Sequence, residues 1–211
     1  MRISYWFILA TALALFACNN GGKPAAEGRL PILGARQAGP NGDTTYQTIP
    51  GFSFLNQDSV FISQDSLDGK IYVADFFFTT CPTICPIMTK NMVDVYDAYK
   101  GNPRVKIYSH SIDPRHDSVA VLKAYADALG VSSDTWHMVT GDKLEIFAMA
   151  KAYMVSALED PTAPGGLVHS GAFILIDPDR RIRGYYDGTK PEEVQELIAD
   201  IQRLINEYFP G

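Results

Sequence analysis

Two cysteines close together are the residues of this chain whose type and spacing best suit chemistry. Cys81 and Cys85 are separated by Pro82-Thr83-Ile84, and Pro86 follows directly. Prolines on both sides stiffen the segment, so both sulfurs can lie on one side of the loop without being forced into a bond. Paired thiolates favour Cu(I), and an added imidazole makes a three-coordinate site that also accepts Cu(II).

A structural disulfide is the simpler interpretation of this pair. Cys81 and Cys85 close a very short loop, however, and the stabilisation by a disulfide grows with the length of chain it closes. The third cysteine, Cys18, lies in the N-terminal leader. A redox dithiol is the other alternative, in which Cys81 attacks and Cys85 resolves, as in a thiol–disulfide oxidoreductase or thiol peroxidase. The familiar redox loop has two residues between its cysteines, whereas this loop has three.

The elements around the cysteines must present them at the edge of a sheet. Residues 71–78, IYVADFFF, form an almost continuous apolar run, which predicts a central strand buried on both faces. Apolar residues then recur at helical spacing from 86 to about 99. The crevice at the carboxyl end of such a strand is where ligands usually bind in open α/β sheets. The positive helix end should let both thiolates form below the ordinary cysteine pKa of ~8.5.

The remaining pattern predicts an α/β fold. We expect a hairpin over 49–63, strands over 104–112, 171–177 and 181–187, and helices over 121–129, 144–154 and from Thr189 onward. Thr189 and Glu192 have the spacing of a helix-starting capping box. The predicted fold class is an α/β sandwich, with a central mixed β-sheet flanked by helices and an N-terminal β-hairpin. This arrangement, with a cysteine pair between a buried strand and a helix, resembles the thioredoxin-like fold.

His169 is the best candidate for the imidazole among the four histidines. It lies in PGGLVHSG (164–171), a glycine-containing loop directly before an apolar strand. In thioredoxin-like folds the loop at that point faces the dithiol. We therefore expect Cys81, Cys85 and His169 to be the metal ligands.

The chain resembles the Sco/SenC family of copper-binding, thioredoxin-like proteins over residues 48 to 208. The resemblance is carried by five segments: Cys81-Pro82-Thr83-Ile84-Cys85-Pro86, Ser111-Ile112-Asp113-Pro114 with His116-Asp117-Ser118, Trp136 to Gly141, His169-Ser170, and Asp177-Pro178-Asp179. It implies an assembly factor for the dinuclear copper site of cytochrome c oxidase, acting as metallochaperone or thiol reductant rather than as a turnover enzyme. It also implies one copper per chain, as Cu(I) or Cu(II), with the copper-bearing oxidase subunit and a periplasmic copper donor as partners.

Two positions depart from the family pattern. Many members have Asp where this chain has Thr83, and many have Asp where it has Val168. These changes leave the Cys-Cys-His set intact but remove nearby carboxylates that could supply a fourth ligand for Cu(II). Asp113 is our candidate for a residue that orients the site from outside the ligand set, with a simple turn aspartate before proline as the alternative.

The N-terminus predicts export and anchoring. Residues 1–17 have a positive start at Arg2 and an apolar run too short for a mature membrane span, ending at Ala17-Cys18. We interpret them as a lipoprotein signal peptide, with Cys18 as the lipidated residue that holds the chain to a bacterial membrane in the periplasm. Residues 18–45 are interpreted as a flexible tether and 46–211 as the copper-binding domain. The net charge of −6 excludes a nucleic-acid binder, which needs clustered Lys and Arg.

Overall fold

Three parallel strands form the centre of the molecule. The computed structural model describes residues 28–39 and 41–210. The central strands are β5 (Ile71–Phe77), β6 (Val105–Ser111) and β7 (Trp136–Thr140), paired in that order. Every residue of β5 is buried, as its continuous apolar sequence predicts for a strand covered on both faces.

Antiparallel strands extend this centre on both sides into a seven-stranded sheet, in the order β11-β10-β5-β6-β7-β3-β4. The added strands are β10 (Ala172–Ile176), β11 (Ile182–Asp187), β3 (Ser53–Asn56) and β4 (Phe61–Ser63). The pair β3–β4 is the hairpin expected over 49–63. A mixed central sheet of thioredoxin-like type is therefore confirmed.

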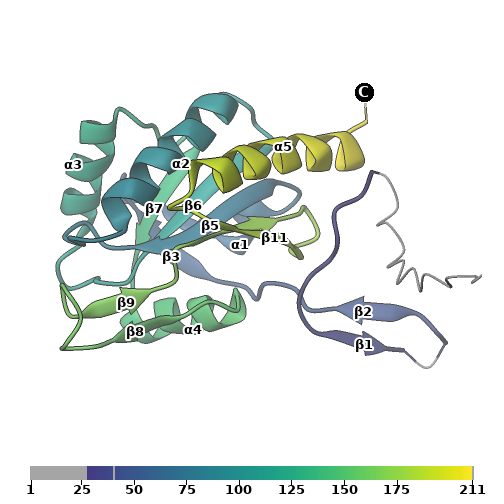
Figure 1. Cartoon of the computed structure of the whole chain (residues 1–211), viewed down its shortest axis with the longest axis horizontal. Coiled ribbons are helices and arrows are strands. Elements are labelled where there is room, and N and C mark those ends of the chain that lie inside the picture. Colours follow the sequence, from purple (N-terminus) through teal and green to yellow (C-terminus); the bar gives the residue numbers. More distant parts are fainter. Residues whose placement is uncertain (1–27, 40, 211) are drawn as a thin grey trace, which may run out of the picture.

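Helices cover the two faces of the sheet. Figure 1 shows α2, α3 and α5 on one face and α4 on the other. Their bounds are α1 (Gln64–Leu67), α2 (Cys85–Tyr99), α3 (Val119–Leu129), α4 (Lys143–Ala152) and α5 (Pro191–Tyr208). The helix α4 begins after Asp142, whose carboxylate accepts hydrogen bonds from the main-chain N–H groups of Leu144 and Glu145.

The structure differs from the sequence-based expectation at two places in the core fold. The strand β7 was not expected, although it joins β6 to β3. The capping box at Thr189 is wrong, because the helix α5 begins after Lys190 with Pro191 in its first turn. Thr189 instead donates its hydroxyl to the carboxylate of Asp187. A further two-stranded sheet, β8 (Ala157–Glu159) with β9 (Leu167–His169), lies outside the main sheet.

Part of the segment interpreted as a tether is docked on the domain. Residues 28–35, which we call the strap, run beside the edge strand β11, where the Leu33 N–H donates to the Ile182 carbonyl at 2.8 Å. The strands β1 (Arg36–Ala38) and β2 (Thr44–Tyr46) then form a small hairpin. The domain boundary at residue 46 stays a prediction, and the signal peptide and Cys18 lie outside the described residues.

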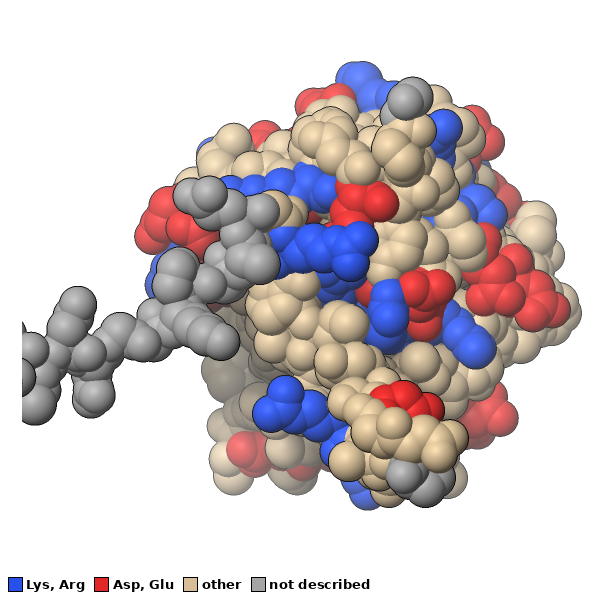
Figure 2. Space-filling model, turned by 90° about the vertical axis from the view of Figure 1, so that its right-hand side faces the viewer, with Lys and Arg blue, Asp and Glu red and all other residues tan. Residues whose placement is uncertain are grey.

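A buried arginine holds the strap. Arg183 of β11 is 3% exposed and donates to the main-chain carbonyls of Leu30 and Pro31 at 2.6 and 3.1 Å. Its guanidinium also pairs with Asp177 at 3.0 Å and with Glu207 at 2.9 Å. Figure 2 shows this side of the molecule, where basic and acidic side chains are interspersed. The strap is thus fixed at the end of the sheet where β5 begins, opposite the cysteines.

Candidate metal centre

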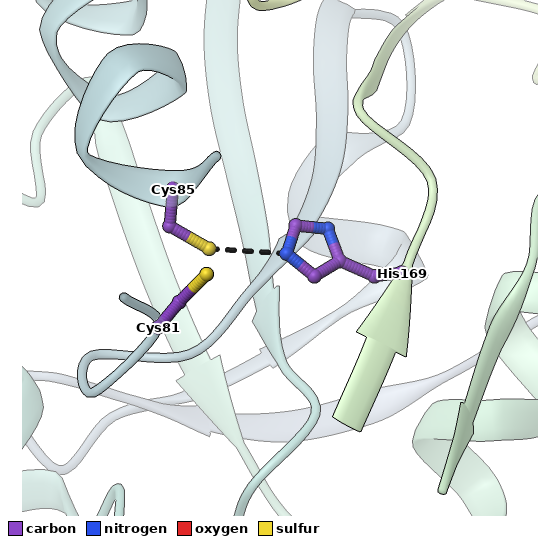
Figure 3. Close-up of side chains that lie close together, drawn as sticks. All are labelled: Cys81, Cys85 and His169. Atoms are coloured by element: carbon purple, nitrogen blue, oxygen red, sulfur yellow. Dashed lines mark hydrogen bonds between the residues drawn. The ribbon is translucent and has the colours of Figure 1, made fainter. Parts of the chain in front are cut away.

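Cys81 and Cys85 lie where β5 ends and α2 begins (Figure 3). The main-chain N–H of Cys81 donates to the carbonyl of Phe78 at 3.2 Å, which turns the chain away from the sheet. Cys85 is the first residue of α2, and Pro86 follows it in the first turn, where its missing N–H leaves no unmet hydrogen bond. Both thiols are buried, with Cys81 7% and Cys85 2% exposed, and they are free.

His169 is brought to the cysteines by the strand β9 and the loop before it. Gly165 of that loop has a φ of +82°, and a Cβ on it would lie 2.9 Å from the ring of Phe78. Only glycine allows this approach without displacing Phe78. The imidazole of His169 then packs edge-on against the same Phe78 ring, with 5.9 Å between the ring centroids.

The three side chains converge on one point. Nε2 of His169 lies 3.0 Å from Sγ of Cys85, as the dashed line in Figure 3 shows. One donor atom from each of the three residues lies within 4.8 Å of the other two. Metal bonds to sulfur and nitrogen are about 2.0–2.3 Å long, so this spacing suits a single ion. Two sulfurs with one imidazole nitrogen form a soft donor set, which suits copper.

The tautomer of His169 is fixed by the main chain. Its Nδ1 lies 3.0 Å from the carbonyl oxygen of Ser170, which can only accept, so Nδ1 carries the proton. Burial lowers the pKa of His169 and keeps the ring neutral, although the Ser170 bond acts in the opposite direction. The lone pair of Nε2 is therefore presented to Cys85, where it accepts a hydrogen bond or binds a metal ion.

The two thiols differ in acidity. Burial opposes ionisation of Cys81, but hydrogen bonds from Cys85 and Thr83 outweigh it and bring the pKa of Cys81 below its ordinary value. Burial raises the pKa of Cys85 well above its ordinary value, and the neighbouring Cys81 adds to the effect. The expectation that both thiolates form easily is thus met for Cys81 only. Cys85 holds its proton in the metal-free protein and can donate it either to the sulfur of Cys81 or to Nε2 of His169.

A small cavity of about 140 Å³ opens beside the site, between the cysteine loop and the loop that carries His169. Thr83 lines this cavity, and its hydroxyl oxygen lies 3.5 Å from Sγ of Cys81. Val168 lines it from the other side. Neutral side chains therefore occupy both positions where many family members carry Asp.

Asp113, the candidate for an orienting carboxylate, lies in the turn after β6. Its main-chain carbonyl accepts from the N–H groups of His116 and Asp117 at 3.0 and 2.9 Å. Among the hydrogen bonds of the described residues, none joins its carboxylate to a cysteine or to His169. The orienting role of Asp113 therefore stays a prediction.

Asp117, which the sequence reasoning placed only in a family motif, is fully buried behind the cysteine loop. It accepts from the Thr79 N–H at 3.1 Å, from the Ser111 hydroxyl at 2.5 Å and from His116 Nδ1 at 3.0 Å. These bonds tie the residues before Cys81 to the end of β6. In the sequence, Asp117 lies two residues before the start of the helix α3. Polar residues are common at that position, so the sequence gave no indication that Asp117 is buried.

A second buried acid, Asp75 of β5, lies beneath the site. Burial raises its pKa to about 7, and the hydroxyl of Ser109, its hydrogen-bond donor, lowers it. The indole N–H of Trp136 donates in turn to that hydroxyl at 2.9 Å. Asp75 also contributes to the raised pKa of Cys85 through its charge. In the sequence, Asp75 lies within the apolar run 71–78, which predicted a buried strand. Nothing in that run indicated a function for its carboxylate.

Comparisons with known proteins identify one family and several similar solved structures. The family model SCO1/SenC matches residues 41–206. A crystal structure of a SCO1/SenC family lipoprotein from Bacillus anthracis is 31% identical, with 75% of this chain and 95% of that chain covered and a TM-score of 0.68. The structure of BsSco, described with a disulfide switch and as a member of the Sco family of cytochrome c oxidase assembly proteins, is 32% identical, with 78% and 95% covered and a TM-score of 0.66. Copper-bound ScoI of Bradyrhizobium japonicum is 27% identical, with 74% and 99% covered and a TM-score of 0.62.

Proposed function

This chain belongs to the SCO1/SenC family, and we propose that it binds one copper ion through Cys81, Cys85 and His169 to serve assembly of the dinuclear copper site of cytochrome c oxidase. The observation that carries the proposal is the convergence of two sulfurs and one imidazole nitrogen within 4.8 Å. Related proteins support it, since one was solved with copper bound and another is described as an oxidase assembly protein.

Copper is the cargo of this site, and its two oxidation states use the donors differently. Two thiolates suffice for Cu(I), whereas Cu(II) needs the nitrogen of His169 as well. Binding requires both sulfurs as thiolates, so Cys85 must release the proton that it shares with His169.

The same pair of thiols can act in redox chemistry. Cys81 and Cys85 would form a disulfide by losing two electrons and two protons to an oxidant such as a partner disulfide, and the disulfide leaves no thiolate for Cu(I). The lowered pKa of Cys81 and the protonated state of Cys85 suit a nucleophile and a resolving thiol. This observation favours the second candidate, a thiol–disulfide oxidoreductase or thiol peroxidase.

For the partners, we propose the copper-bearing subunit of the oxidase as acceptor and a periplasmic protein as copper donor. We also propose that Cys18 carries lipid and holds the domain to a bacterial membrane on its extracytoplasmic side. A related family member is described as a lipoprotein. No helix among the described residues is long and apolar enough to cross a bilayer.

Three alanine variants test the copper site. We expect Cys81→Ala and Cys85→Ala each to abolish tight copper binding, measured by titration of the reduced protein against a competing chelator. The loss should exceed the roughly 10- to 100-fold effect of removing a residue that only supports a ligand. His137→Ala serves as the matched histidine control, because His137 lies on β7 outside the ligand triplet. Full copper retention in either cysteine variant would show that the site is wrongly assigned.

His169→Ala separates the two candidate functions. We expect it to keep the fold and the reversible disulfide, to bind Cu(I) more weakly, and to lose Cu(II) together with its thiolate-to-copper absorption band. Cells with this variant should assemble less oxidase when copper is limiting. Normal oxidase assembly together with unchanged Cu(II) binding would favour the oxidoreductase, whose chemistry needs only the two sulfurs.

A further inference from the structure

Thr83 lies in the cysteine loop and touches a proposed copper ligand without being a ligand candidate itself. Its hydroxyl oxygen lies 3.5 Å from Sγ of Cys81, close enough for a hydrogen bond to sulfur. No other described residue hydrogen-bonds this hydroxyl. The β-branched side chain of threonine has few rotamers, so few other positions compete with the one that places the hydroxyl beside the sulfur.

The state of Cys81 decides which of the two atoms donates. A neutral thiol could donate to the hydroxyl oxygen of Thr83. A thiolate has no proton, whether it is free or bound to a metal ion, so the hydroxyl must then be the donor. Hydrogen bonds to an ionised acceptor are also stronger than neutral ones. The contact therefore stabilises the negatively charged form of this sulfur.

The two sulfurs of the site receive different support. Main-chain N–H groups of Thr83 and Cys85 donate to Sγ of Cys81, in addition to the Thr83 hydroxyl. Sγ of Cys85 has a main-chain hydrogen bond from Phe78 and lies 3.0 Å from Nε2 of His169. Among these groups, the hydroxyl of Thr83 is the donor that a side-chain substitution can remove while all three proposed ligands stay in place.

The charges of the site determine which copper ion such a donor favours. Two thiolates with Cu(I) carry one net negative charge, whereas the same donors with Cu(II) are neutral. The reduced complex therefore has the more negative sulfurs, and a hydrogen bond to one of them stabilises Cu(I) more than Cu(II). A carboxylate in the same place would favour Cu(II), the more positive ion. None of the residues that line the cavity beside Thr83 carries a carboxylate.

We propose that Thr83 is a positioning residue whose hydroxyl donates to the Cys81 thiolate and thereby favours Cu(I) over Cu(II) at the metal centre. This inference rests on the proposed copper function and names the oxidation state that the site favours. Hydrogen bonding around a cysteine sulfur tunes the potential of copper sites. The same bond supports the reduced thiol pair in the metal-free protein, because a disulfide has no thiolate to accept it.

The first test compares the reduction potential of bound copper in the full-length wild type and in Thr83→Val. Valine keeps the branched shape and removes the hydroxyl. A redox mediator gives one electron to each Cu(II), and the loss of the thiolate-to-copper absorption band follows the reaction. We expect the ratio of Cu(I) affinity to Cu(II) affinity to fall about tenfold, which lowers this one-electron potential by about 59 mV.

The second test uses the metal-free protein and does not depend on copper. The Cys81–Cys85 disulfide is equilibrated with dithiothreitol, whose two thiols supply two electrons and two protons and become a disulfide themselves. In Thr83→Val the reduced pair loses a donor, so the equilibrium should shift about tenfold toward the protein disulfide. That shift lowers the two-electron potential by about 30 mV.

Two further variants make the result specific. Thr83→Ser keeps the hydroxyl and should restore both potentials. Thr80→Val is the matched control, because Thr80 is an exposed threonine of the same loop that no hydrogen bond of the described residues joins to a sulfur. Unchanged potentials in Thr83→Val, equal shifts in Thr80→Val, or no restoration in Thr83→Ser would each overturn the inference. A wild type that binds no copper would contradict the proposed function instead, and the potential of the thiol pair would then decide the role of Thr83.

Discussion

The two ends of the central sheet bury polar groups in opposite ways. At the strap end, the guanidinium of Arg183 is surrounded by hydrogen-bond acceptors. They are the carboxylates of Asp177 and Glu207 and two main-chain carbonyls. At the metal end, two thiols and an imidazole are equally buried, but they have few partners. The Cys85 thiol can donate to His169 or to Cys81, and it is the main link among the three side chains.

This difference suggests that the strap end contributes mainly to stability and the metal end mainly to function. A buried charge with every partner in place holds the strap, and removing Arg183 takes away the buried cation of this cluster. The thiols and the imidazole are left with free lone pairs, which is the condition for binding an ion. We therefore expect changes at the strap end to alter the free energy of unfolding and changes at the metal end to alter copper affinity.

The largest expected effect comes from breaking the strap end. Arg183→Leu should lower the free energy of unfolding by about 3–5 kcal/mol, because it removes the buried cation shared by Asp177 and Glu207. The more exposed Arg181 still pairs with Asp177 but does not reach the carbonyls that hold the strap. Chemical denaturation of the metal-free protein measures this change. Copper affinity should stay the same at temperatures where the variant is folded.

Arg203→Leu is the matched control for that experiment. Arg203 also pairs with an aspartate, Asp200, at 2.9 Å, but its side chain is 63% exposed. An exposed pair of this kind contributes about 0–1 kcal/mol. Equal destabilisation by the two substitutions would remove the distinction between the two ends.

A smaller effect is expected at Asp75, the buried acid beneath the metal end. Its folded-state pKa of about 7 exceeds the ordinary value of 3.8, so the folded protein binds a proton that the unfolded chain releases. Its stabilising contribution is complete below the unfolded pKa of 3.8 and is lost progressively as the pH rises toward 7. Between pH 5 and pH 8, this group should lower the free energy of unfolding by about 3 kcal/mol, nearly all of it below pH 7.

Asp75→Asn tests this pH dependence, because the amide keeps the shape and does not titrate. Chemical denaturation of wild type and variant at pH 5 and pH 8 gives the change in the free energy of unfolding with pH for each protein. His110 and His137 titrate in both proteins, so their contributions cancel when the two changes are subtracted. Parallel pH profiles of the two proteins would show that Asp75 is ionised throughout.

The smallest expected effect sharpens the contrast within the metal end itself. In the reduced, metal-free protein at pH 7, Cys81 should react with iodoacetamide roughly tenfold faster than Cys85, because thiolate is the reactive form and only Cys81 has a lowered pKa. Peptide mass spectrometry after brief labelling measures the ratio. The preference should vanish in urea, and faster labelling of Cys85 in the folded protein would contradict the assignment of its proton.

The elements closest to the metal were predictable because their signals are local. The strand β5 is a continuous apolar run, and α2 shows helical spacing directly after it. The strand β7 was missed because it has five residues and contains the polar His137. Its partners, β6 and β3, are distant in sequence, so only the assembled sheet makes this segment a strand.

The candidate site was predictable in its residues but not in its electrostatics. Cysteine spacing and the loop before β10 pointed to the three side chains that the structure brings together. The raised pKa of Cys85 depends first on burial, then on the neighbouring Cys81 and on the charge of Asp75. The histidine that can accept its proton is 84 positions away in the sequence. Likewise, the turn at Asp113 buries Asp117 rather than Asp113, and a main-chain turn of this kind leaves no pattern in the side chains.

The strap also has a consequence for how copies of this protein behave toward each other. The strand β11 is the last strand of the sheet, and an uncovered last strand invites pairing with another chain and aggregation. The hydrogen bond from Leu33 to Ile182 occupies part of that edge. A fragment that began at residue 46 would keep every proposed metal ligand and lose this cover. Copies of that fragment could then pair through their β11 strands. In the longer chain, the strap blocks part of this edge and so opposes self-association.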